Sequence, residues 1–313
     1  MFGRVNFLNK KMVATLKIRS KAIHAARQWL NQNAYIEVQG PIIVPATGEW
    51  PSYLKTEVFE KKAYLAQGLH PYSQIYAASL GKIYTFAPTF RVEKTSTNHH
   101  LIEFWRIEVV QQTKLENIMR VQEKLIEHIC QNLSKSSENE LTILDRSTKD
   151  LEKIHAPFKK ITYEEAIQKL QNQGSKIVWG ETIEKEKEKN LSNMFNQPFF
   201  ITEFPVNYET FFYETVKEKP ELTKSADLIV PQGYGELSSG AQKITNKKEL
   251  SKKMQEMKIN PKDQQWYLNL IKNSKTPQSG FAIGFERLIQ WICNIKDIKQ
   301  TTPYPRTPEN IYP

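Results

Sequence analysis

Two long strand-like runs follow one another in the first half of the chain, and they restrict the fold more than any other feature. The runs are KIYTFAPTFRVE, residues 82–93, and LIEFWRIEVV, residues 101–110, and the polar stretch KTSTNHH joins them. Runs rich in β-branched and aromatic residues on either side of a short polar loop are typical of an antiparallel hairpin. Because successive side chains of a strand point to opposite faces, Arg91 and Glu93 are expected on the same face of this hairpin.

Shorter strand-like runs and amphipathic helices surround this hairpin. Strands are predicted at AYLAQ, QPFFITEFP and ADLIVP, and at YIEVQGPIIVP, where Pro41 is expected to end or kink the strand. Helices are predicted over residues 13–33, 115–133, 163–173, 247–257 and 261–272. The polar residues 134–160 are interpreted as a connection, and GFAIGFERLIQWICNI as a strand that turns through Gly284 into a helix. Hairpins with helices around them, without βαβα alternation, indicate an α+β fold with a mostly antiparallel sheet.

The composition is that of a water-soluble globular protein, for which a cytoplasmic location is expected. The 313 residues are 39% hydrophobic, no apolar run approaches the roughly 18 residues of a membrane span, and the first residues lack an apolar signal region. Cys130 and Cys293, the only cysteines, fit two reduced core thiols. The net charge of +10 suits an anionic partner, either nucleic acid or a polyphosphate, but lysines mixed with glutamates, as in EKEKEKN, also serve solubility alone.

The hairpin carries three kinds of side chain that together suit a nucleotide. The guanidinium of Arg91 matches phosphate oxygens, the Glu93 carboxylate can accept a hydrogen bond from an exocyclic amine such as that of adenine, and Phe104 offers a flat face to a base. The same residues would equally form a surface ion pair and a core phenylalanine in an ordinary hairpin. The run GFAIGFERL adds glycines, which allow close backbone approach, and Arg287 at a strand-to-helix corner.

These segments resemble the class II aminoacyl-tRNA synthetases. FRVE…HHLIEFWRIE is similar to motif 2 of that class, GFAIGFERL to motif 3, and IEVQGPIIVP to motif 1, the dimer-forming segment that ends in proline. Within the class the chain resembles the aspartyl and asparaginyl group, with PFKKITYEEAI, WYLNLIK, GELSSGAQKI and DIKQTTPYPRTPENIYP as further similar segments. The similarity runs from about residue 12 to the C-terminus, with the motifs in the family's order.

The resemblance implies a six- to seven-stranded antiparallel sheet, flanked by helices, that binds a bent ATP. The residues that it places at ATP are Arg91 (α-phosphate), Glu93 (adenine amine), Phe104 and Arg287 (the two sides of the adenine), His99, His100 (γ-phosphate) and Glu236. Asp227 and Glu236 match the positions that hold Mg²⁺, although a turn cap and a solvated glutamate are the alternatives. Catalysis is expected from Arg91, Arg287 and His100, which position ATP and offset its charge while a substrate carboxylate attacks the α-phosphorus.

The start of the chain departs from the family, because only about a dozen residues precede the first predicted helix. Aspartyl- and asparaginyl-tRNA synthetases carry an anticodon-binding OB domain before motif 1. A single catalytic domain over residues 1–313, without that OB domain, is therefore expected. This layout resembles the truncated archaeal paralogs that make asparagine, in which ammonia takes the activated carbonyl. It favours ammonia or another amine as acceptor, and it makes tRNA a possible partner that is not favoured.

The amino-acid pocket departs as well, since QGLHPYSQ, residues 67–74, stands where the family has QSPQLYKQ or VSGQLYLE. The aspartyl-type lysine becomes Ser73, the asparaginyl-type glutamate becomes Gln74, and the family's glutamine becomes His70. The residues that the resemblance places around the amino acid are Glu49, Gly68, His70, Ser73, Gln74 and Lys243. Lys243 replaces an arginine, and with a titratable His70 it would suit a carboxylate side chain, whereas a packed neutral histidine is the alternative.

The motif 2 loop has a histidine, His99, where the family has an arginine. Histidine is a weaker and pH-dependent donor to phosphate. Adenylate formation is therefore predicted to be slow below saturation with ATP, most of all at alkaline pH, and His99→Arg is predicted to raise the rate.

Three functions follow from these observations. The first is an ATP-dependent ligase that forms an aminoacyl-adenylate from aspartate, asparagine or a close analogue and transfers the acyl group to ammonia or another amine. The second is an asparaginyl- or aspartyl-tRNA ligase that recognises only the acceptor stem. The third is a non-catalytic binding protein, which the retained charged residues disfavour. By resemblance to motif 1 a homodimer is expected, and no membrane partner is.

Overall fold

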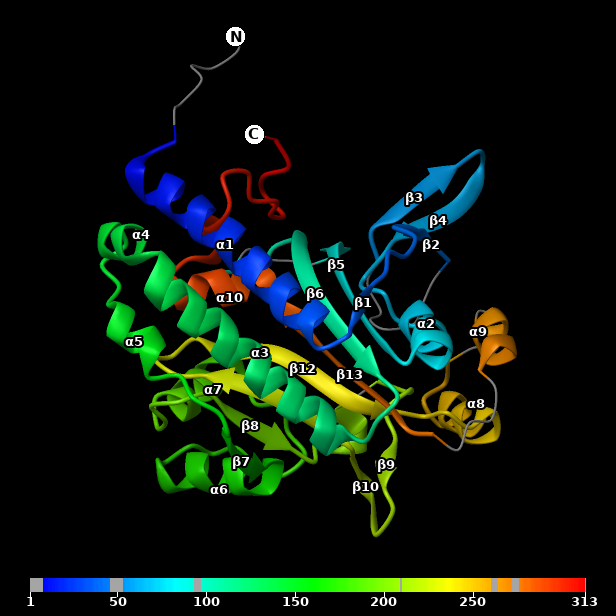
Figure 1. The fold of residues 1–313 in the computed structure, drawn as a ribbon. Coiled ribbons are helices and arrows are strands. Elements are labelled where there is room, and N and C mark those ends of the chain that lie inside the picture. Colours follow the sequence, from blue (N-terminus) through cyan, green and yellow to red (C-terminus); the bar gives the residue numbers. More distant parts are fainter. Residues whose placement is uncertain are drawn as a thin grey trace.

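The computed structural model describes residues 8–45, 53–92, 97–208, 210–259, 264–271 and 276–312. An eight-stranded sheet forms its centre (Figure 1). From one edge to the other the strands are β1 (Ile36–Glu37), β5 (Lys82–Phe90), β6 (Glu103–Gln111), β13 (Gln278–Gly284), β12 (Gly235–Lys243), β11 (Ser225–Val230), β8 (Phe199–Thr202) and β7 (Lys159–Thr162).

The pairing confirms the predicted α+β fold and its central hairpin. β5 and β6 pair antiparallel, with Phe90 opposite Glu103, and the strands from β5 to β8 in the sheet are all antiparallel. The edges differ from the expected antiparallel sheet of six to seven strands, because β1 lies parallel to β5 and β7 lies parallel to β8. Long crossovers join both edge pairs, and such connections permit parallel strands.

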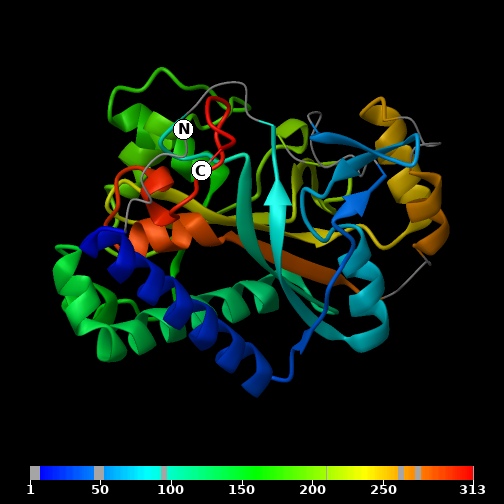
Figure 2. The same ribbon diagram turned by 90° about the horizontal axis from the view of Figure 1, so that it is seen from above.

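Three helices cover one face of the sheet: α1 (Lys10–Gln32), α3 (Leu115–Ser136) and α10 (Phe285–Ile292). Figure 2 shows them gathered on the same side, with α1 and α3 next to each other. Asn9 caps the N-terminus of α1, since its side chain accepts a hydrogen bond from the Met12 amide. Its buried face is rich in alanine, and side chains this small let the helix lie close to its neighbours.

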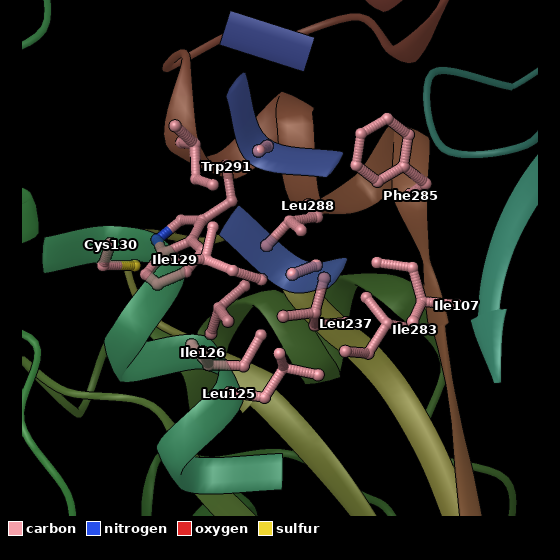
Figure 3. Close-up of a cluster of buried hydrophobic side chains, with 14 of the residues drawn as sticks. Ile107, Leu125, Ile126, Ile129, Cys130, Leu237, Ile283, Phe285, Leu288 and Trp291 are labelled. Atoms are coloured by element: carbon pink, nitrogen blue, oxygen red, sulfur yellow. The ribbon is translucent and has the colours of Figure 1, made fainter. Parts of the chain in front are cut away.

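The main hydrophobic core fills the space between these helices and the sheet. In Figure 3, side chains of α3, α10 and the strands point toward one another, among them Ile129, Leu288, Trp291, Ile107 and Ile283. Cys130 and Cys293 lie in the same cluster as free, buried thiols, as the sequence predicted. This packing places the helices on one face and leaves the other face of the central strands for the site.

Smaller elements frame the sheet. They are α2 (Tyr72–Leu80), α4 (Glu138–Ile143), α5 (Thr148–Glu152), α6 (Tyr163–Asn172), α7 (Lys185–Ser192), α8 (Lys247–Glu256), α9 (Gln265–Leu270), two short 3₁₀ turns at Val206–Tyr208 and Ile298–Thr301, a sheet of β2 (Ile43–Val44), β4 (Lys61–Leu65) and β3 (Lys55–Val58), and a ribbon of β9 (Thr215–Val216) and β10 (Lys219–Thr223).

Most predicted helices are present, and one expectation about local structure is wrong. The stretch 134–160 is not a plain connection, because α4 and α5 bury Leu141 and Leu151 in the main core. The run YIEVQGPIIVP is interrupted around Pro41, as predicted, and its two halves enter different sheets as β1 and β2. α2 and α7 were not foreseen.

Candidate active site

The period-two alternation of the central strands creates a cavity on the face opposite the helices. On β6, Phe104, Arg106 and Glu108 line this cavity, while Ile107 and Val109 enter the core. β11 follows the same rule, with Asp227 toward the cavity and its neighbours in the core. The cavity has a volume of about 990 Å³, which is in the range of sites that enclose a small-molecule ligand.

Most of the predicted site residues meet in this cavity. Those that line it are His70, Ser73, Arg91, His99, His100, Phe104, Asp227, Glu236, Lys243 and Arg287. Gly68 and Gln74 lie just behind its wall. Glu49 and Glu93 lie outside the described residues.

In the half predicted for the nucleotide, Arg287 and Glu236 form the central ion pair. Arg287 Nη1 lies 3.0 Å from the Glu236 carboxylate and donates to the Glu236 carbonyl oxygen at 3.1 Å. Burial raises the pKa of Glu236, but the cations of Arg287, Lys185 and Arg91 outweigh it and lower that pKa to about 2. Arg91 and Arg287 therefore act on the same carboxylate, so the two guanidinium groups converge as the motifs predicted.

The two histidines of the motif 2 loop are neutral in this environment. Burial, with the nearby cations of Arg287, Arg91 and Lys185, lowers the pKa of His100 to about 3. His100 Nδ1 lies 2.9 Å from the Thr97 hydroxyl. Burial and the charges of Lys185 and Arg287 also lower the pKa of His99. Because its pKa is lowered, His99 loses its charge at a lower pH than an ordinary histidine, and the slow formation of adenylate stays a prediction.

A buried carboxylate that the sequence analysis did not single out connects the two walls of the nucleotide half. Glu286 on α10 accepts a hydrogen bond from the Trp105 amide at 2.8 Å and pairs with Arg19 of α1 at 2.9 Å. Glu286 directly precedes Arg287 in the chain, and its hydrogen-bond partner Trp105 directly follows Phe104. The predicted adenine-facing residues thus sit on strands and helices that Glu286 ties together.

A second carboxylate, Glu108, the last residue of the motif 2 run HHLIEFWRIE, shapes the loop that follows β4. Both of its carboxylate oxygens accept from the Leu69 amide, at 3.0 and 3.1 Å, and Arg106 donates to the Gln67 carbonyl at 2.6 Å. A Cβ atom at Gly68 would lie 2.5 Å from Glu108 Oε1 and 2.7 Å from Arg106 Nη1. Only glycine therefore fits between these side chains without displacing them.

In the half predicted for the amino acid, His70 is packed rather than charged. Its ring stacks on Phe212, with 3.8 Å between the ring centroids, and among the described residues neither ring nitrogen has a hydrogen-bond partner. Burial, followed by the charges of Lys243 and Arg106, keeps the pKa of His70 well below its usual value. Of the two expectations for this residue, the environment favours the neutral, packed histidine.

Two further pocket residues are held by aromatic neighbours. The Lys243 ammonium lies over the rings of Phe212 and Tyr213, 4.6 and 4.3 Å from their centroids. The Gln74 side chain accepts from the Tyr267 hydroxyl and donates to the Ile244 carbonyl oxygen at 3.4 Å. Gln74 thus fixes the wall of the pocket, while Ser73 lines its surface.

The fold is that of the class II synthetases. The sequence matches the family described as tRNA synthetases class II (D, K and N) over residues 3–308, and the chain belongs to that family. The predicted resemblance is therefore confirmed.

Within the family, the similar proteins include asparagine–tRNA ligases. That of Thermococcus gammatolerans is 35% identical over 305 residues, which cover 97% of this chain and 71% of that protein. That of Pyrococcus abyssi is 34% identical over 314 residues, which cover 100% of this chain and 72% of that protein. The structure of asparaginyl-tRNA synthetase from Pyrococcus horikoshii complexed with asparaginyl-adenylate superimposes with a TM-score of 0.94 at 33% identity, covering 97% of this chain and 70% of that one. In the part of the chain that the structure describes, no helix combines the length and apolarity that a membrane span requires.

Proposed function

We propose that this protein activates asparagine, aspartate or a close analogue with ATP, giving an aminoacyl-adenylate and pyrophosphate. The observation that carries the proposal is the convergence of Arg91, Arg287 and the half-buried Phe104 on one cavity that also contains the Glu236 carboxylate. The fold shared with a synthetase complexed with asparaginyl-adenylate supports the same chemistry.

The proposed reaction needs positioning and charge neutralisation rather than proton transfer. A carboxylate oxygen of the amino acid bonds to the α-phosphorus while the bond from that phosphorus to the oxygen bridging the β-phosphate breaks, and pyrophosphate leaves with the bridging oxygen. Arg91 and Arg287 offset the negative charge that gathers on these oxygens. His99 and His100 are neutral and act as hydrogen-bonding groups, which suits a reaction without a general base.

The carboxylates Asp227 and Glu236 fit a nucleotide-bound Mg²⁺. Both line the cavity, and the low pKa of Glu236 keeps it ionised. Among the described residues no group of three or more His, Cys, Asp or Glu side chains forms a complete protein metal site. Mg²⁺ at triphosphates commonly uses one or two carboxylates and takes its remaining ligands from phosphate and water, so this donor set suits it. Bound there, the ion would neutralise phosphate charge.

For the second half of the reaction we propose ammonia or another amine as acceptor. An acyl-adenylate reacts with any amine that reaches its carbonyl, and the acceptor then needs no phosphate-binding cation. The neutral His99, at the position of the family's arginine, supports this choice because it offers no charge to a nucleic acid backbone. The roles of Glu49 and Glu93 toward the amino acid and the adenine remain predictions.

A tRNA acceptor is the second candidate. The observation that favours it is the 34–36% identity to asparagine–tRNA ligases over nearly the whole chain, together with the net charge of +10. The net charge alone does not distinguish a tRNA acceptor from a small amine, because positive charge around the cavity also favours ATP.

Amino-acid-dependent exchange of labelled pyrophosphate into ATP tests the first half of the reaction. Exchange with asparagine or aspartate, and not with unrelated amino acids, is expected. No exchange with any amino acid would contradict the proposal and leave the non-catalytic binding protein. Single-turnover transfer from the isolated adenylate complex to ammonium, to small amines and to total tRNA then separates the two acceptors.

We also propose a homodimer formed through the motif 1 segment. Ile36 and Ile43 of this segment are 47% and 53% exposed, although apolar residues are usually covered. Light scattering that shows a monomer at micromolar concentration would contradict this dimer.

The free, buried thiols support the expected cytoplasmic location. The expectation of one catalytic domain over residues 1–313 stays a prediction.

A further inference from the structure

Lys185, in the first turn of α7, is a cation of the cavity that none of the roles above uses. Its ammonium lies 2.9 Å from Glu188 and 3.5 Å from Glu236, and its side chain is 38% exposed. It lines the cavity together with Arg91 and Arg287. The ammonium is therefore held at the site and remains accessible from it.

The partners of Lys185 fix it in place. Glu188 follows three residues later on the same face of α7, and its carboxylate also accepts from the Glu236 amide. A Cβ atom at Gly235 would overlap the Glu188 carboxylate, so α7 packs directly against the start of β12. This contact places Lys185, which belongs to the run EKEKEKN, beside Glu236, the predicted metal ligand.

Lys185 lies on the side of the cavity where the nucleotide would end. Its charge acts on His99 and on His100, the residue expected near the γ-phosphate. The charges of Arg287 and of Arg91, the residue expected at the α-phosphate, act on the same imidazole of His100. Arg91, His100 and Lys185 thus lie in the same part of the cavity, where a triphosphate held by Arg91 would be within reach of the Lys185 ammonium.

We propose that Lys185 binds the β- and γ-phosphates of ATP and the pyrophosphate that leaves, and this inference rests on the function proposed above. Without nucleotide, Glu236 and Glu188 hold the ammonium. The flexible lysine stem would let the ammonium turn from these carboxylates to the phosphate oxygens of a nucleotide bound beside Glu236. The same group then stabilises the charge that develops on the leaving oxygen.

The neighbouring Lys187 provides a matched control on the same helix. It pairs with Glu184 at 3.6 Å, and Glu184 is 72% exposed on its side chain. Lys187 does not line the cavity. Replacing either lysine by methionine removes one positive charge from α7. The two variants differ in that the Lys185 ammonium lines the cavity beside Glu236, whereas Lys187 reaches the cavity only through its partner Glu184.

Equilibrium binding of MgATP, magnesium pyrophosphate and AMP to the full chain tests the proposal. Lys185→Met is expected to lower the affinity for MgATP and for magnesium pyrophosphate about tenfold, because a hydrogen bond to a charged group contributes roughly that factor. The affinity for AMP is expected to change less than about twofold. Lys185→Arg is expected to retain most of the affinity, and Lys187→Met to match the wild type. Thermal unfolding of the variants checks that each is folded.

Two results would overturn the inference. One is MgATP affinity in Lys185→Met equal to that in Lys187→Met. The other is an equal loss for AMP and ATP, which would make Lys185 an organiser of the site rather than a ligand of the outer phosphates. Wild-type protein that binds MgATP through Lys185 but shows no pyrophosphate exchange would overturn the proposed function alone, whereas wild-type protein that binds no MgATP would overturn both.

Discussion

Arg287 contacts Glu236 twice, through its carboxylate at 3.0 Å and through its backbone carbonyl oxygen at 3.1 Å. The two contacts orient the guanidinium before any ligand binds, at the corner where β13 becomes α10. Because the pKa of Glu236 is about 2, the pair stays ionised over the whole range in which the protein would work. An oriented cation needs little rearrangement when charge develops on a substrate.

Arg287→Ala is expected to lower the rate of ATP–pyrophosphate exchange at least about a hundredfold, since it removes an oriented donor from the transition state. Arg287→Lys should restore little of the exchange rate, because an ammonium lacks the planar, two-pronged donor geometry of a guanidinium. Arg27→Gln is the control, as Arg27 forms its ion pair with Glu37 at 2.8 Å outside the cavity. Exchange in Arg287→Ala equal to that of Arg27→Gln would contradict the assignment.

His99→Arg is expected to raise exchange several-fold at ATP concentrations below saturation, by the same factor at pH 7 and pH 9. The reason is the direction of the pKa shift: the folded protein holds His99 below its usual pKa, so the imidazole is neutral across this interval and has no charge left to lose as pH rises. A wild-type rate that falls on passing from pH 6.5 to pH 8, while that of His99→Arg does not, would show that His99 is charged after all.

The motifs and the strand alternation predicted several charged and aromatic residues that share the cavity. They placed Arg91 and Phe104 on the central hairpin and Arg287 at the last corner, and the structure brings all three to one cavity. The positions of these residues can be predicted from local sequence, because each lies in or next to a short strand-like run and the alternation along that run determines the face to which its side chain points. The same reasoning predicted the helical layer over the core.

Contacts across long stretches of chain were not predictable in the same way. Lys185 belongs to EKEKEKN, whose alternating charges are typical of a solvated helix, and only the packing of α7 on β12 turns it to the cavity. Gln74 matched a substrate-binding position, yet Tyr267, far along the chain, engages its side chain. The pKa of His70 depends on burial, which the sequence does not specify.

Gly68→Ala is expected to lower kcat/KM for the amino acid roughly 10- to 100-fold, with a smaller effect on the KM for ATP. The added methyl group would displace Glu108 and Arg106, and small displacements of positioning groups cost that much. Gly174→Ala is the matched control: its φ of +86° makes alanine strained, but no atom lies within 4 Å of the new Cβ. Both variants lose stability in urea unfolding, and a kcat/KM as high in Gly68→Ala as in Gly174→Ala would count against the role of this loop.

Glu286 offers a test of how α1 supports the site. Its carboxylate is 3% exposed and its partner Arg19 is 13% exposed, so Glu286→Gln breaks a buried ion pair and should lower the free energy of unfolding by about 3 kcal/mol. Lys21→Met, which breaks a more exposed pair with Glu140, should cost under about 1 kcal/mol.

The kinetic effect of Glu286→Gln should be selective. Glu286 accepts a hydrogen bond from the Trp105 amide, next to Phe104, and directly precedes Arg287. Loosening that hydrogen bond would move Phe104 and Arg287 apart, and these are the residues predicted on the two sides of the adenine. The KM for ATP is therefore expected to rise several-fold more than the KM for the amino acid, measured by exchange at a temperature where the variant is fully folded. Arg19→Met should reproduce this selectivity from α1, and combining both substitutions should cost less than the sum of the two, because they remove the same pair. Additive losses, or KM values for ATP and amino acid that rise together, would show that α1 stabilises the fold without positioning the nucleotide half.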